Sequence, residues 1–510
     1  MRANHSLHRS MIRSAYRALY RALYLALIAA VAVACSAPEN PRYPLVLRGG
    51  RVMDPNSGMD TIADVAIAGG RIVAISMKPL RGDSVIDVAG LVVAPGFIDL
   101  HAHGQDSADM WLKVRDGVTT QLEMEIGVYP VAPWYAAMEG HAPANYGATV
   151  SHLSARFAEF HGIEVGHWSL NPQAILALGP NPAGANQAAT PQQVLSIAAR
   201  LQQGLDEGAL GVGFGINYTP AATRAEITTM FRIAALNRAT AYVHTRRFGL
   251  GAIREAIETA DTTGASLHIV HIGSSGGSEV REALALIDSV REAGLDVSTE
   301  VYPYTAASTL IESALFNPGW QENLHITYGD LAWPATGERL TKETFDKYRA
   351  QGGAVTIYMM QDANIEYALA YPSVIVASDG MPFVNGAGHP RGTGTSARLL
   401  GRYVRTQQLM PLMTALAKLT ILPALRLESY LPAMRQKGRI AVGADADITI
   451  FDPATVIDNA TYETPMVPSS GIPFVMVNGT LVVRDGVPVG GVSPGRAVRV
   501  PASGGRRPEP

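Results

Sequence analysis

Two histidines that alternate along one segment give the clearest sign of chemistry in this sequence. His101 and His103 end the segment PGFIDLHAH at residues 95–103. On a β-strand these two side chains point to the same side, so both imidazoles can reach one cation. The alternative is a solvated or structural strand face. The apolar Ile98 and Leu100 and the glycine that follows His103 favour a metal site instead.

Three further polar residues end apolar segments later in the chain: His244 after AYV, His271 after HIV and Asp379 after VIVAS. Alone, either histidine is more often a core residue than a ligand. His268, three residues before His271, is expected to face the opposite way and to pack under a helix. A carboxylate such as Asp379 is costly to bury unless it faces a metal or a hydrogen-bond donor. Together with the first pair, these residues indicate one centre built from distant segments.

The elements that must position these residues alternate between strand-like and helical patterns. Helical stretches are predicted at residues 191–207, 224–238, 250–263 and 279–293. These four are examples; in all, eight strand-like segments alternate with helical ones. Eight alternations favour a (β/α)8 TIM-like barrel over residues 93–435 rather than an open doubly wound sheet. The carboxyl ends of the barrel strands then meet on one face, where catalysis occurs. The strands are expected to end near His103, Ile126, His152, Tyr218, His244, His271, Tyr302 and Asp379.

The two flanks of this region have a different pattern. Residues 44–92 and 436–490 contain short alternating segments separated by Gly-Gly and Asn-Gly turns, which are hairpin signals. We expect them to form one small β-sandwich built from both ends of the chain. The connection before Asp379 is long, and it is expected to carry an inserted lobe at about residues 311–353 that covers the active site.

The amino terminus has the pattern of a secretory signal. A basic stretch precedes the apolar residues 23–34, and that run is too short to span a bilayer comfortably. Residues 1–34 are therefore predicted to be a signal peptide that ends before Cys35, in a segment that resembles the lipobox of bacterial lipoproteins. The alternative is a plain signal peptide or an uncleaved anchor with an incidental cysteine.

The lipoprotein interpretation implies export and lipidation of Cys35, on the bacterial cell envelope and facing the periplasm. Ser36 resembles the signal for sorting to the outer membrane. Cys35 is the only cysteine, so no intramolecular disulfide can form.

Bulk composition excludes some other classes of function. The 41 basic and 44 acidic residues nearly balance, whereas binding of nucleic acid needs clustered positive charge. No nucleic-acid partner is expected. The carboxyl-terminal residues 494–510 are rich in Gly, Pro and Arg and are predicted to be disordered.

These motifs resemble the amidohydrolase superfamily and, within it, the D-aminoacylase (N-acyl-D-amino-acid deacylase) group. The resemblance extends from Tyr43 to Val487. Its superfamily marks are GFIDLHAH, the later histidines and Asp379. Marks nearer the deacylase group are GVTT at 117–120, VYPYTAAST at 301–309, HPRGTGT at 389–395, LGRYV at 400–404 and GADAD at 443–447.

The resemblance implies a fold of the metallo-dependent hydrolase type with one or two Zn²⁺ ions. His101, His103 and Asp379 would hold the first metal, and His244 and His271 the second. Relatives bridge the metals with a carboxylated lysine or a cysteine, and neither stands at the corresponding places here. We infer that a glutamate replaces the cysteine, with Glu125 first and Glu123 as the alternative; a surface strand with two solvated glutamates is the other interpretation.

The resemblance also implies a reaction, hydrolysis of N-acyl-D-amino acids. Zinc would lower the pKa of a water molecule and polarise the scissile carbonyl, while Asp379 would carry a proton to the departing amine. Tyr302 would help to hold the carbonyl oxygen, and Arg391 or Arg246 would pair with the substrate carboxylate. Tyr218 and Ser308 complete the expected substrate site.

Departures from the family pattern leave the substrate open. Ser274 and Ser275 stand where related deacylases have a lysine, and Phe248 replaces an acidic residue. The alternatives are a D-residue dipeptidase or a cyclic-amide hydrolase on the same scaffold. An alternative of another class is a non-catalytic binding protein of the envelope. The number of metals, the preferred side chain and the oligomeric state stay open.

Overall fold

The computed structural model describes residues 41–167, 174, 176–179 and 181–501. The predicted signal peptide, Cys35 and Ser36 lie outside the described residues. Within the described part of the chain, no helix combines the length and the apolar character that crossing a bilayer requires.

Eight parallel strands form the central barrel, which confirms the predicted fold class. The first and last strands meet through a parallel bridge between Ala102 and Gly380, and the amide of His103 donates to the Gly380 carbonyl at 2.9 Å. The strands in spatial order are β6 (Phe97–Asp99), β7 (Val118–Tyr129), β8 (Asn145–Ser151), β10 (Val212–Gly215), β11 (Thr240–His244), β12 (Ser266–Ile269), β13 (Val297–Val301) and β17 (Ile375–Val376), and the short β9 (Gly166–His167) pairs with β7.

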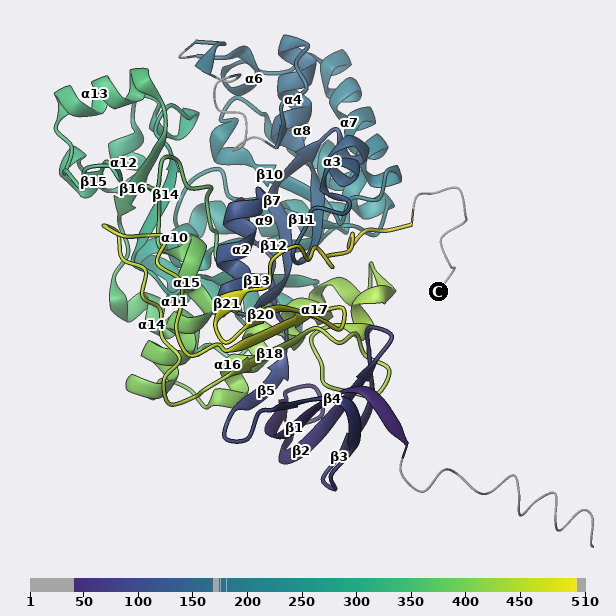
Figure 1. Cartoon of the computed structure of the whole chain (residues 1–510). Helices are drawn as coiled ribbons and strands as arrows, with labels where there is room; N and C mark the ends of the chain where they lie inside the picture. The colour runs from purple at the N-terminus through teal and green to yellow at the C-terminus, as the bar shows by residue number, and fades with distance from the viewer. Residues whose placement is uncertain (1–40, 168–173, 175, 180, 502–510) are drawn as a thin grey trace, which may run out of the picture.

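Helices cover the outside of this barrel (Figure 1). The helix α9 shows why: its buried residues Ile253, Ala256, Ile257 and Ala260 recur at helical spacing and form one apolar face. The four predicted helices are α7 (Pro191–Asp206), α8 (Arg224–Leu236), α9 (Leu250–Thr263) and α11 (Val280–Glu292). The others outside the inserted lobe are α2 (Ser107–Arg115), α3 (Val131–Met138), α4 (His152–His161), α6 (Ala183–Asn186), α10 (Ile272–Gly276), α14 (Asp362–Ala370), α15 (Arg391–Arg398), α16 (Leu412–Leu419) and α17 (Ile421–Glu428).

The flanking residues 42–95 and 448–488, predicted to form a small β-sandwich, meet in a second, nine-stranded sheet in the lower half of Figure 1. The strand β5 pairs antiparallel with β18 and then leads directly into the first barrel strand. Apolar residues such as Val93, Ile448 and Ile450 form a separate core there. The strands are β1 (Arg42–Asp54), β2 (Met59–Ala68), β3 (Arg71–Ser76), β4 (Arg81–Asp87), β5 (Val92–Pro95), β18 (Ile448–Phe451), β19 (Phe474–Val477), β20 (Thr480–Arg484) and β21 (Val487–Pro488).

A small lobe projects from the barrel between β13 and β17 (Figure 1). Its three-stranded antiparallel sheet starts at Ala306 and ends at Tyr358, so the lobe is wider than residues 311–353. Aromatic stacking between Trp333 and Tyr348, with ring centroids 4.1 Å apart, holds it together. Its elements are β14 (Ala306–Leu310), η4 (Ala314–Phe316), α12 (Trp320–Leu324), β15 (Leu331–Ala332), α13 (Lys342–Gln351) and β16 (Ala354–Tyr358).

The prediction of a disordered tail from residue 494 is wrong for residues 494–501. The amide of Val498 donates to the Tyr146 carbonyl at 2.7 Å, and the amide of Val500 donates to the Gly208 carbonyl at 3.2 Å. Val498 and Val500 are buried against the barrel. The prediction was based on the Gly, Pro and Arg content of the tail and did not take the alternating Val498 and Val500 into account. Burial of these two side chains offsets the entropy that the segment loses on ordering. Residues 502–510 lie outside the described part.

Candidate active site

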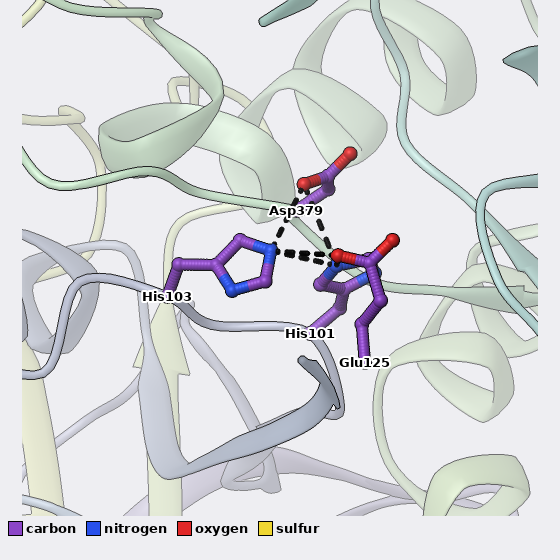
Figure 2. A group of neighbouring side chains, drawn as sticks. All are labelled: His101, His103, Glu125 and Asp379. Atoms are coloured by element: carbon purple, nitrogen blue, oxygen red, sulfur yellow. Dashed lines mark hydrogen bonds and ion pairs between the residues drawn. The ribbon is translucent and has the colours of Figure 1, made fainter. Parts of the chain in front are cut away.

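Four side chains from three strand ends converge on one point at the carboxyl end of the barrel (Figure 2). The Nε2 atoms of His101 and His103 lie 3.0 Å apart. Oε2 of Glu125 lies 3.2 Å from the first and 3.1 Å from the second. Oδ1 of Asp379 is 3.4 Å from both. All four residues are buried, and their ligand atoms are close enough together to hold one metal ion.

A second group shares Glu125 with the first. Its other oxygen, Oε1, lies 2.7 Å from Nδ1 of His244 and 2.9 Å from Nε2 of His271. These three residues form a further candidate metal group. The structure therefore brings together His101, His103, His244, His271 and Asp379 around the two oxygens of one carboxylate.

The backbone turns sharply where two of these residues leave their strands. His271 has a φ of 34° and Asp379 a φ of 50°. Residues other than glycine rarely adopt positive φ, and where they do the conformation is held by the surroundings. The turn brings the His271 side chain to Glu125 and the Asp379 side chain to His101 and His103.

Two more carboxylates orient the first pair of histidines by contacting Nδ1, the ring nitrogen on the other side from Nε2. Glu300 Oε1 lies 2.5 Å from Nδ1 of His101, and Glu123 Oε2 lies 2.6 Å from Nδ1 of His103. Glu123 also accepts hydrogen bonds from the amides of Ile126 and Gly127, both at 3.2 Å. Glu123, the alternative bridging residue, is thus outside both candidate metal groups.

The expectation that His268 packs under a helix is wrong. Its Nε2 lies 3.2 Å from Oε2 of Glu300, and its Nδ1 lies 2.7 Å from the hydroxyl of Ser298. Through Glu300 it is connected to His101 inside the barrel. Sequence reasoning missed Glu300, although a glutamate inside the strand VSTEV, two residues before Tyr302, was a detectable signal.

A buried network braces the two strand ends that carry His101 and Asp379. Asp99 Oδ1 accepts hydrogen bonds from the amide of His101 at 3.1 Å and from the amide of Ser378 at 2.9 Å. Lys113 Nζ lies 3.0 Å from Asp99 Oδ2 and also 2.5 Å from the Ser378 hydroxyl. Because Ser378 directly precedes Asp379, this network fixes the distance between the two ends. Lys113 was not recognised from the sequence.

Arg391 lies directly beside Asp379. Its Nη2 is 3.0 Å from Asp379 Oδ1 and donates to the carbonyl of Ser308 at 3.1 Å. Its guanidinium lies over the ring of Tyr302, 4.6 Å from the ring centroid. Burial opposes ionisation of Asp379, but Arg391 and His101 outweigh it and hold the pKa of this carboxyl below its usual range.

A small cavity of about 30 Å³, called the inner cavity below, lies against these residues. Its polar lining includes His103, Glu125, His244, His271 and Asp379, together with Tyr302, Ser308 and Tyr218. Much of the remaining wall is apolar and comes from barrel loops and from the lobe: Ile126, Phe248, Ala307, Leu315, Ile357, Met359 and Met381. The structure thus places the predicted substrate residues Tyr302, Ser308 and Tyr218 at the cavity, with Arg391 directly behind it.

Arg246 is the exception among the predicted substrate residues. Its Nε lies 3.0 Å from Glu255, and its Nη1 donates to the carbonyl of Ala222 at 2.7 Å. It lines other cavities, but not the inner one. The structure therefore does not bring Arg246 to the inner cavity, and of the two arginines expected to pair with the substrate carboxylate it places Arg391 nearer.

The electrostatics of the site favour a cation. Among the described residues, the carboxylates of Glu123, Glu125 and Glu300 lie against histidines, and that of Asp379 lies against histidines and the guanidinium of Arg391. Burial lowers the pKa of the His101 imidazole, but Asp379, Glu125 and Glu300 raise it to about 10. Imidazole and carboxylate donors are ligands that zinc accepts, so these residues fit such an ion.

Comparisons with known proteins identify the family of this chain. A model of the family described as "Amidohydrolase family" matches residues 84–483. N-acyl-D-glutamate deacylase of Alcaligenes xylosoxydans xylosoxydans is 31% identical over 504 residues, which cover 91% of this chain and 98% of that protein. D-aminoacylase of the same organism is 30% identical over 482 residues, covering 87% and 95%.

Among solved structures, N-acyl-D-glutamate deacylase from Bordetella bronchiseptica, complexed with zinc and a phosphonate inhibitor that mimics the tetrahedral intermediate, matches with a TM-score of 0.76. It is 27% identical in sequence, and the match covers 90% of this chain and 100% of that one.

Proposed function

Because this chain belongs to the amidohydrolase family, we propose that it removes the acyl group from N-acyl-D-amino acids with the help of one or two zinc ions. It is a hydrolase of carbon–nitrogen bonds other than peptide bonds. The observation that carries the proposal is that both oxygens of Glu125 face histidine pairs, at 2.7–3.2 Å, beside a cavity. The choice of D-amino acids is supported by the similarity to an N-acyl-D-glutamate deacylase and a D-aminoacylase.

The chain's own residues define where the metals would bind. His101, His103, Glu125 and Asp379 would hold one ion, and Glu125, His244 and His271 the other. Zinc bound there would polarise a carbonyl group and would lower the pKa of a water molecule toward 7. Glu300 and Glu123 keep the imidazoles of His101 and His103 in the orientation that presents Nε2 to the metal.

Asp379 is proposed to move the proton. As an ionised carboxylate on the cavity wall, it can accept a proton from the attacking water and return it to the departing amine nitrogen. The transfer is needed because an unprotonated amide nitrogen is a very poor leaving group. The ion pair with Arg391 keeps Oδ1 in place before the reaction.

The substrate carboxylate is assigned to the side of the cavity beside Arg391. Two of its guanidinium nitrogens, Nε and Nη1, are buried without a hydrogen-bond partner among the described residues. The hydroxyl of Ser308 is also unpartnered there and lines the cavity. A carboxylate would satisfy these donors, which are costly to leave unpaired. The Tyr302 hydroxyl is assigned to the carbonyl oxygen.

The test is a stereochemical assay on metal-free and zinc-loaded protein. We expect zinc-dependent release of leucine from N-acetyl-D-leucine and none from N-acetyl-L-leucine. The Asp379→Asn variant, purified in the same way, controls for contaminating enzymes. Equal hydrolysis of both enantiomers would exclude the D-specific assignment, and preferential opening of a cyclic amide such as hydantoin would favour the alternative. Activity that survives removal of all metal would refute the proposed chemistry.

We also propose, from the sequence alone, that the protein is exported and anchored to the cell envelope through a lipid on Cys35. In cells fed labelled palmitate, the wild-type protein should become labelled, and the Cys35→Ser variant should carry no label. A labelled Cys35→Ser variant, or an unlabelled wild-type protein, would contradict the proposal of a lipid anchor.

A further inference from the structure

A second and larger cavity, called the outer cleft below, opens beside the inner cavity. Its volume is about 450 Å³, against about 30 Å³ for the inner cavity. It lies between the loops that follow β10 and β11 and the η4–α12 segment of the lobe. Its lining includes Asn217, Arg246, Arg247, Leu315, Asn317 and Trp320.

The two cavities share one wall. Leu315 lines both of them. Tyr218 and Phe248 face the inner cavity, whereas their chain neighbours Asn217 and Arg247 face the outer cleft. The rings of Tyr218 and Phe248 also lie 5.0 and 5.9 Å from that of His244. The outer cleft is therefore one side chain away from the candidate metal site.

Hydrogen-bond donors dominate the polar part of the outer cleft on its barrel side. Nδ2 of Asn217 and Nη2 of Arg246 are buried without a partner among the described residues. Arg247 is exposed and forms no ion pair within the described part of the chain. The single carboxylate of the lining, Glu322, is exposed to solvent. Unpaired buried donors favour a ligand rich in acceptors. The guanidinium of Arg247 favours a negative one, whereas the charge of Arg246 is already paired with Glu255.

The position of the cleft indicates which end of the substrate it receives. Arg391 and Ser308, assigned to the amino-acid carboxylate, lie near the ends of β13 and β17. The outer cleft adjoins the ends of β10 and β11, three positions away around the barrel. A substrate anchored at Arg391 with its scissile bond at Glu125 thus directs its acyl group toward the outer cleft.

We propose that the outer cleft is a subsite for the acyl group, and that it selects acyl chains that extend beyond acetyl and end in a carboxylate. The inference rests on the proposed deacylase function and adds a substrate class to it: N-acyl-D-amino acids whose acyl group comes from a dicarboxylic acid. Arg247 is the specificity-determining residue, supported by the donors of Asn217 and Arg246.

The experiment compares two substrates that differ only at the far end of the acyl chain. N-glutaryl-D-leucine ends in a carboxylate, and N-pentanoyl-D-leucine has a methyl group at the same position. We expect a higher kcat/KM for the glutaryl substrate. Arg247→Ala should lower the ratio of the two values about fivefold, the effect of about 1 kcal/mol for an exposed charge pair. Arg247→Lys should retain most of the ratio, and Arg254→Ala, an exposed arginine outside the lining, should not change it.

Failure of the subsite and failure of the proposed function give different results. If the wild type does not prefer the glutaryl substrate, or if Arg247→Ala lowers both values equally, the subsite is wrong and the deacylase remains. If neither substrate is hydrolysed, calorimetric binding of N-glutaryl-D-leucine to the zinc-loaded protein decides. Binding weakened about fivefold by Arg247→Ala supports the subsite without turnover, and unchanged or absent binding overturns it.

Discussion

The different positions of two neighbouring glutamates predict how strongly each one affects metal binding. Glu125 places its oxygens 2.7–3.2 Å from nitrogens of His101, His103, His244 and His271. Glu123 instead lies 2.6 Å from Nδ1 of His103, the nitrogen that faces away from the first metal group, and accepts hydrogen bonds from two backbone amides. Each glutamate is replaced in turn by glutamine, which keeps the shape of the side chain and removes its negative charge.

The magnitudes follow from these contacts. Glu123→Gln leaves both candidate metal groups complete and weakens the orientation of His103, so zinc affinity should fall about 10–100-fold, or about 1.4–2.7 kcal/mol. Glu125→Gln removes a charge shared by both candidate metal groups. If the charge contributes about 2 kcal/mol to zinc binding in each group, its removal should cost about 4 kcal/mol of binding free energy, which is close to a thousandfold loss of zinc affinity.

The assay is competition for zinc between each metal-free variant and a chromophoric chelator. Circular dichroism on the same samples checks that both variants are folded. If Glu123→Gln lost zinc as severely as Glu125→Gln, Glu123 would be a direct ligand, and the reasoning from geometry would be refuted.

Three further predictions concern the reaction, the core and the tail. Asp379→Asn should lower kcat about a thousandfold with an unchanged circular dichroism spectrum; normal turnover would remove its role as proton carrier. Burial lowers the pKa of Lys418 to about 8, so the folded chain releases this proton near pH 8 while the unfolded chain keeps it to above pH 10. Stability should therefore rise by about 3 kcal/mol between these pH values, and denaturant titration of Lys418→Met should lack that slope. Removal of residues 494–510 should destabilise the protein by about 3 kcal/mol, because Val498 and Val500 lose their burial, whereas removal of 502–510 alone should leave the melting temperature unchanged.

Much of the fold could be predicted because its signals are local. The apolar period of α9 marks the helix at the bounds expected from the sequence, Leu250–Thr263. The strand that leads to His244 ends at that residue, as expected. The family resemblance covered the barrel, which is present, and a β-sandwich from the two flanks, which meet in one nine-stranded sheet.

Other features depend on contacts that a linear pattern does not contain. Whether Arg246 reaches the inner cavity depends on where the chain turns after β11, and it turns toward Glu255 and Ala222. The path of residues 494–501 depends on free backbone groups at Tyr146 and Gly208, which lie hundreds of residues earlier. The amino-acid composition of a segment does not show which distant backbone or side-chain groups it will contact.

The types of donor and their order along the chain could be read directly from the sequence: alternating histidines, later histidines and an aspartate at strand ends, and a glutamate pair on β7. These follow from side-chain period and residue chemistry, which are properties of short segments. Only the tertiary structure decided that Glu125 faces both histidine pairs and Glu123 lies behind one of them, because strand register and twist set the direction of each carboxylate. It also decided which buried partners, Glu300, Lys113 and Arg391, hold the site in place, because they come from strands and helices that meet only in the closed barrel.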